Sequence, residues 1–180
     1  MPSPANNSSW LRAVVVAVIL CGPFTSPLGA QRRAELMRLV NRTVSGTVTS
    51  VTDGDSVRIR LDGTTHTIPV RLEGIDAPET GEPFSNQARI AARVLMFDKT
   101  VQVMARDVDT YDRLVARVIV AGKDASLELL QSGLACHFTR FKNDSVLAKG
   151  QLDARKAGKG FWAAGTEKPR CVKFTQPQVK

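Results

Sequence analysis

The chain has 180 residues, of which 43% are hydrophobic and 23% are charged, and this composition is typical of globular proteins rather than of disordered chains. The length allows one domain with a real core and is short for two. Lys and Arg (25) outnumber Asp and Glu (17), which gives a formal net charge of +8. Excess positive charge favours polyanionic partners such as nucleic acid, although many basic proteins bind none.

The first thirty residues have the pattern of an export signal. Arg12 precedes an apolar run at 13–20, which is shorter than the ~20 residues needed to span a bilayer. Small residues follow, so we expect a signal peptide over residues 1–30 that is cleaved near Ala30. This predicts a secreted or periplasmic protein without membrane attachment after cleavage. A lipid anchor at Cys21 and an uncleaved membrane anchor are the alternatives.

Two cysteines, Cys136 and Cys171, remain after cleavage. An oxidising compartment permits one disulfide between them. The alternative is one buried thiol and one free thiol in a loose tail. No Cys/His spacing resembles a zinc site, so His66 and His137 are interpreted as structural or surface residues.

After a polar lead-in with helical character at 31–42, the pattern turns to strands. Residues 43–52 are rich in β-branched side chains, and 55–61 alternate strictly between apolar and polar. "DG" at 62–63 predicts a hairpin whose return strand covers 64–72. The remaining elements are expected, in chain order, as a helix, two strands, a short helix, an extended piece and a last helix: 83–97, 100–108, 114–120, 124–134, 135–141 and 143–157.

This order of elements predicts an α+β fold. Short strands joined by hairpins suit a small closed barrel with helices over its open ends, and we expect a five-stranded OB-fold barrel with about three packing helices. The domain is expected over 43–162, and the tail at 163–180 has no clear period. OB-folds often bind oligonucleotides, but a fold alone does not establish function.

Acidic residues gather at one end of the predicted hairpin. Asp53 and Asp55 open its first strand, and Asp76 and Glu79 follow its second. Antiparallel neighbours bring these positions to the same end. Carboxylates so close repel one another unless a hard cation neutralises them, and oxygen-only ligation suits calcium or magnesium. A pair of solvated acidic turns is the alternative.

Two arginines accompany these acids. Arg71 projects from the hairpin, and Arg113 lies in a loop between strands. Two guanidiniums beside a metal site can hold a phosphate, because each binds two oxygens in a planar fork. Glu79 is then the candidate general base. The alternative makes the arginines salt-bridge partners of the acids.

Five segments together resemble the thermonucleases, the micrococcal-nuclease-like family, over about residues 43–162. They are "TDGDSVRI" (52–59), "RLEGIDAPET" (71–80), "DTYDR" (109–113), "LQSGLA" (130–135) and "GFW" (160–162). The resemblance implies an OB-fold phosphodiesterase that requires calcium, cleaves DNA and RNA and leaves 3′-phosphate ends. It implies no stable protein partner, and we expect a monomer.

By position, the resemblance assigns the calcium ligands to Asp55, Asp76 and the backbone carbonyl of Ala77. Asp53 would support these ligands from behind. Glu79 would orient or deprotonate the attacking water.

The resemblance also assigns substrate contacts. Arg71 and Arg113 would bind the phosphate and stabilise the transition state, Tyr111 would contact phosphate, and Phe141 would stack on a base. The residue before Arg113 is Asp112, where the family commonly has glycine. Asp112 favours the alternative function, a catalytically weak or inactive OB-fold nucleic-acid-binding module, whereas the intact set of acids and arginines favours the enzyme.

Overall fold

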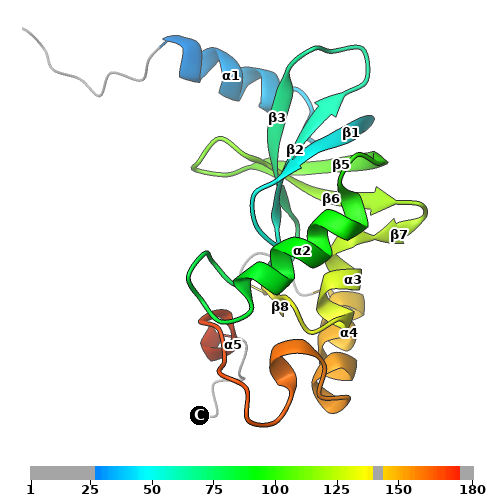
Figure 1. Cartoon of the computed structure of the whole chain (residues 1–180). Helices are drawn as coiled ribbons and strands as arrows, with labels where there is room; N and C mark the ends of the chain where they lie inside the picture. Colours follow the sequence, from blue (N-terminus) through cyan, green and yellow to red (C-terminus); the bar gives the residue numbers. More distant parts are fainter. Residues whose placement is uncertain (1–26, 140–143, 175–180) are drawn as a thin grey trace, which may run out of the picture.

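The computed structural model describes residues 27–139 and 144–174 (Figure 1). The expected signal peptide through residue 26, the base-stacking candidate Phe141 and residues 175–180 lie outside the described residues. No helix within the described residues has the length and apolar character needed to cross a bilayer.

Five strands close into a barrel, which confirms the predicted α+β OB-type fold. The antiparallel order is β3-β2-β1-β5-β6, and a parallel pairing between β3 and β6 closes the barrel. The short β7 (Lys123–Asp124) extends β6. The barrel strands are β1 (Thr43–Val51), β2 (Ser56–Leu61), β3 (Thr67–Leu72), β5 (Thr100–Val108) and β6 (Leu114–Val120).

The strands form where the sequence alternates. Val57 and Ile59 of β2 point into the core, whereas Arg58 and Arg60 are exposed. Because successive side chains of a strand point to opposite faces, this alternation buries one face of the hairpin and leaves the other for charged groups. The predicted hairpin is therefore present, with β2 and β3 paired antiparallel.

Helices cover the barrel, as the sequence predicts. They are α1 (Pro27–Met37), α2 (Ser85–Met96), α3 (Ala125–Gln131) and α4 (Ser145–Lys156). Asp124 and Asp144 cap α3 and α4 by accepting hydrogen bonds from backbone N–H groups of the first turn. In Figure 1, α2 runs along the barrel and α3 lies beside α4. Helix α1 extends across Ala30, the expected cleavage position, and contacts β5.

A second, smaller core lies below the barrel. Strand β4 (Ile75–Asp76) pairs with β8 (Cys136–His137), and a disulfide joins Cys136 to Cys171 at the start of α5 (Cys171–Phe174). Both cysteines pack with Phe161 of the 3-10 helix η1 (Gly160–Trp162). Cys136 and Cys171 therefore form the disulfide that the sequence permits. Residues 163–174, which have no sequence period, are anchored to the domain by the disulfide and by hydrogen bonds of Thr166 and Lys168.

Two glycines let the end of α3 and the start of η1 approach each other at van der Waals contact. Gly133 has a φ of 70°, and a Cβ there would lie 2.2 Å from the carbonyl oxygen of Lys159. Gly160 has a φ of 54°, and its Cβ would lie 2.1 Å from the carbonyl oxygen of Gly133. The "LQSGLA" and "GFW" segments therefore need their glycines because the two backbones touch.

We predict that Gly133→Ala lowers the free energy of unfolding by about 3 kcal/mol, because it adds a steric clash to a left-handed backbone. Gly122→Ala is the matched control, since Gly122 has a φ of 78° and a Cβ there would meet nothing within 4 Å. The control should lose only about 1 kcal/mol. Denaturant unfolding measures both values, and equal losses in the two variants would contradict the close approach.

Candidate active site

The closure of the barrel brings the two predicted arginines to one edge. Arg71 in β3 is in register with Ser56 of β2 on one side and with Val115 of β6 on the other. Arg113 immediately precedes β6. The parallel β3–β6 pair therefore places two guanidinium-bearing residues, distant in sequence, at the same end of the barrel.

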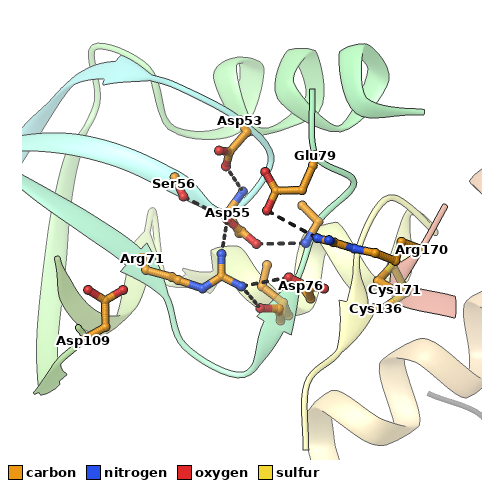
Figure 2. A network of polar contacts seen from close by, with 12 residues as sticks. Asp53, Asp55, Ser56, Arg71, Asp76, Glu79, Asp109, Cys136, Arg170 and Cys171 are labelled. Carbon is orange, nitrogen blue, oxygen red and sulfur yellow. Dashed lines mark hydrogen bonds and ion pairs between the residues drawn. A yellow bond between two sulfur atoms is a disulfide. The ribbon is translucent and has the colours of Figure 1, made fainter. Parts of the chain in front are cut away.

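The Arg71 guanidinium binds two of the predicted carboxylates at once. Its Nη1 lies 2.5 Å from Asp55 Oδ1, and its Nη2 lies 2.9 Å from Asp76 Oδ1 (Figure 2). Nη2 also donates a hydrogen bond to the carbonyl oxygen of Ile75 at 3.3 Å. Asp55 and Asp76 thus meet at one end of the hairpin, and the cation between them is the side chain of Arg71.

Asp55 is nearly buried, with 3% of its surface exposed. Its Oδ2 accepts a hydrogen bond from the Ala77 N–H at 2.9 Å, and its Oδ1 accepts one from the Ser56 hydroxyl at 3.0 Å. Burial raises the pKa of Asp55 to about 7, although Arg71 opposes the shift. Burial therefore disfavours the charged form of Asp55, and the neighbouring Arg71 guanidinium favours it.

Arg113 has its own carboxylate partner. Its Nε lies 2.8 Å from Asp109 Oδ2, and its Nη1 donates a hydrogen bond to Ser56 Oγ at 3.2 Å. Although partial burial raises the pKa of Asp109, hydrogen bonds from Arg113 and from the Tyr111 N–H hold it below its ordinary value. Because Ser56 also donates to Asp55, one polar network connects both arginines.

Ser56 and Asp109 are absent from the sequence-based assignments. Ser56 is the first residue of β2 and is buried, and only the barrel closure brings it between the two arginines. Asp109 had a local signal, because its Oδ1 accepts hydrogen bonds from the N–H groups of Tyr111 and Arg113. This is the turn that an aspartate commonly makes with its own loop, and it could have been expected from "DTYDR".

Asp112 pairs with an arginine other than Arg113. Its carboxylate pairs with Arg33 of α1 at 2.6 Å, and Arg33 also donates to the Asp109 carbonyl oxygen at 2.7 Å. Asp112 has a φ of 54°, a backbone conformation that favours glycine and is tolerated by aspartate. The departure from the family pattern is therefore accommodated by α1.

The other assigned residues surround this network. Asp53 Oδ1 accepts a hydrogen bond from the Asp55 N–H at 3.1 Å, which supports the loop behind the buried carboxylate. Tyr111 is 79% exposed, with its ring 5.4 Å from the Arg113 guanidinium carbon. Glu79 is half exposed on the loop after β4 and faces Arg170 (Figure 2).

A hollow of about 190 Å³ adjoins the loop that carries Glu79. Its lining comes from the turn before β2, the loop after β4 and the first turns of α2: Asp53, Pro78, Thr80, Ser85, Asn86 and Arg89. Arg89 adds a positive charge to this hollow, and its guanidinium is held by Asn86 Oδ1 at 2.9 Å. Space for a ligand therefore lies beside Asp53 and the loop that carries Glu79.

The donor set suits a hard cation. Among the described residues, no three Asp, Glu, His or Cys side chains converge closely enough to form a complete metal site. Asp55 and Asp76, however, share one cation, and the burial of Asp55 favours additional positive charge. Two carboxylates and neighbouring backbone carbonyls provide oxygen ligands alone, which fits calcium or magnesium.

Comparison with known proteins decides the family. The family model described as "Staphylococcal nuclease homologue" matches residues 69–164. The chain belongs to this family. The matched segment includes Arg71, Asp76, Glu79 and Arg113, and Asp55 lies just before it.

Curated relatives carry related names. A "Micrococcal nuclease" of Shigella flexneri is 30% identical over 85% of each chain. An "Uncharacterized endonuclease" of Haemophilus influenzae is 29% identical over 64% of this chain and 65% of its own length. A "Probable staphylococcal-like nuclease" of Oryza sativa subsp. japonica is 35% identical over 53% of this chain, which spans only 29% of the rice protein.

We predict that Asp109, not Asp112, fixes the Arg113 guanidinium. Asp109→Asn should shift and broaden the Arg113 Nε–H resonance in a ¹H–¹⁵N spectrum, because the charged partner at 2.8 Å is lost. Asp112→Gly should leave that resonance in place, since glycine keeps the left-handed backbone and Asp112 pairs with Arg33 instead. A larger perturbation from Asp112→Gly would contradict this geometry.

Proposed function

We propose that the protein is a nuclease that hydrolyses phosphodiester bonds of DNA and RNA with calcium as cofactor. This proposal depends most on one polar network. In it, Asp55 and Asp76 share Arg71, and Ser56 connects Asp55 to Arg113. The acids that could bind a cation are thus adjacent to the arginines that could bind a phosphate. The family membership and the names of the relatives support this proposal.

The two arginines are proposed to bind the scissile phosphate. Each guanidinium can donate two parallel hydrogen bonds to phosphate oxygens, and both are partly buried, which strengthens charge interactions. Negative charge increases on the phosphate oxygens during attack. Arg113 is already oriented by Asp109, so it can stabilise this charge without reorganising.

Calcium is proposed to bind Asp55, Asp76 and the backbone carbonyl of Ala77. When bound, it would supply positive charge to the phosphate and polarise it for attack. Arg71 can turn from the carboxylates to the substrate when another cation neutralises them. Asp53 would keep the Asp55 loop in place through its hydrogen bond to the Asp55 N–H.

Glu79 is the proposed general base. Its half-exposed carboxylate can reach a water molecule, whereas Asp55 is too buried to do so. Glu79 takes a proton from the water, the water oxygen forms a bond to phosphorus, and the bond to the 5′-oxygen breaks in line. The 5′-oxygen takes a proton from solvent and leaves as an alcohol, and the other product ends in a 3′-phosphate.

The proposal also covers the substrate, the location of the protein and its oligomeric state. The net charge of +8 and the exposed Tyr111 beside Arg113 support binding of flexible nucleic-acid strands. The apolar run near the N-terminus supports export to a secreted or periplasmic location. We propose a monomer that needs no protein partner.

We predict that Glu79→Gln lowers kcat on a labelled oligonucleotide by at least about 100-fold, because the general base is lost. Arg113→Ala should lower it by about 100-fold or more through loss of transition-state stabilisation. Glu167→Gln is the matched control, since Glu167 is exposed and outside the network. Full activity in Glu79→Gln or in Arg113→Ala would contradict the role assigned to that residue.

Chelation with EGTA should abolish hydrolysis, and added calcium should restore it. End analysis should then find 3′-phosphates on single- and double-stranded substrates. Calcium-independent hydrolysis would contradict the metal assignment. Oligonucleotide binding without any hydrolysis would support the inactive binding module instead.

A further inference from the structure

The segment after Trp162 reaches the proposed general base. We call residues 163–174 the C-terminal arm. Arg170 of this arm lies with its Nη2 3.9 Å from Glu79 Oε1 and its Nε 3.5 Å from Glu82 Oε1 (Figure 2). A third arginine, outside the segment matched by the family model, therefore faces the carboxylate proposed to activate water.

The arm holds Arg170 in this position by covalent and polar contacts. The next residue, Cys171, is bonded to Cys136, and Cys136 is in register with Asp76 across the β4–β8 pair. Both sulfurs lie in the small second core. The disulfide therefore fixes the backbone next to Arg170 to β8, and β8 pairs with β4, the strand that carries the proposed calcium ligand Asp76.

The N-terminal half of the arm is fixed as well, by hydrogen bonds from Thr166 and Lys168. Thr166 Oγ1 donates to the carbonyl oxygens of Phe161 and Ala163, each at 2.9 Å. Lys168 Nζ donates to the same two carbonyls at 2.6 and 2.7 Å. Arg170 is thus presented by a braced segment rather than by a loose tail.

The loop that carries Glu79 depends on this arm. The Glu79 N–H donates to Glu82 Oε2 at 3.1 Å, and the Glu82 N–H donates to the Glu79 carbonyl oxygen at 2.9 Å. Arg170 binds the other oxygen of the Glu82 carboxylate. At the end of the loop, Phe84 packs edge-on against Phe161 with ring centroids 6.0 Å apart. Glu79 is therefore supported through Glu82, Phe84 and Arg170.

We propose that Arg170, presented by the Cys136–Cys171 disulfide, is a positioning residue for Glu79. It orients the carboxylate toward the attacking water and offsets the repulsion between the Glu79 and Glu82 carboxylates. This inference rests on the proposed nuclease function. An exposed ion pair alone contributes little, so the effect comes from the tether that limits where the Arg170 guanidinium can go.

The main test measures kcat/KM on labelled single-stranded DNA with calcium. Arg170→Ala should lower it about tenfold, and Arg170→Lys should restore most of the loss. In a Glu79→Gln background, Arg170→Ala should cause no further loss, because Arg170 acts through Glu79. Lys173→Ala is the control for charge in the same arm, since the exposed Lys173 makes no ion pair among the described residues.

Two further readouts separate positioning from a structural role. In Arg170→Ala the loss should fall on kcat with KM unchanged, because Arg170 acts on the proposed general base through its ion pairs with Glu79 and Glu82. Cys136→Ser/Cys171→Ser should match Arg170→Ala in kcat/KM, and combining all three changes should add nothing.

The outcomes are distinguishable. A wild-type protein without hydrolysis would overturn the proposed function and this inference together. An active wild type with Arg170→Ala within twofold of it would overturn this inference alone. So would an equal loss from Arg170→Ala in the Glu79→Gln background. The Arg170 variants leave the second core intact, so they decide the question even if the cysteine variants fail to fold.

Discussion

One guanidinium shared by two carboxylates organises this end of the barrel. Arg71 is held by Asp55 and Asp76 at 2.5 and 2.9 Å, and although burial lowers the pKa of Arg71, the two acids raise it overall. Charges taken out of water are costly unless they are paired and hydrogen-bonded. The β2–β3 pairing, which puts Arg71 in register with Ser56, makes this pairing possible, and the β3–β6 closure brings Arg113 beside Ser56. The barrel and the candidate site therefore depend on one set of contacts.

Local patterns predicted most of the fold. Alternation over 55–61 identified a strand because burial of one face has a period of two residues. The helices expected over 124–134 and 143–157 are present, and the aspartates that cap them act within one turn. The C-terminal arm could not be predicted in this way. Its position comes from a disulfide and from packing on Phe161, and neither leaves a periodic signal.

The site was predictable where hairpin geometry determined it. The antiparallel turn placed Asp55 near Asp76, since the two ends of a hairpin must coincide. Contacts between segments distant in sequence were not predictable. The pairing of Arg33 with Asp112 and the approach of Arg170 to Glu79 depend on which loops the barrel and the disulfide bring together. The family resemblance named the acids and arginines but could not supply these partners.

Asp55 and Asp76, which share the Arg71 guanidinium, are proposed to bind calcium. The most direct test is a calorimetric titration of the full-length protein with calcium, without nucleic acid. We predict that one calcium ion binds per chain and that binding is lost in Asp55→Asn and in Asp76→Asn. Asp109→Asn should still bind calcium, because Asp109 pairs with Arg113 and not with Arg71. Calcium affinity that is unchanged by both Asp55→Asn and Asp76→Asn would show that these carboxylates do not bind the ion.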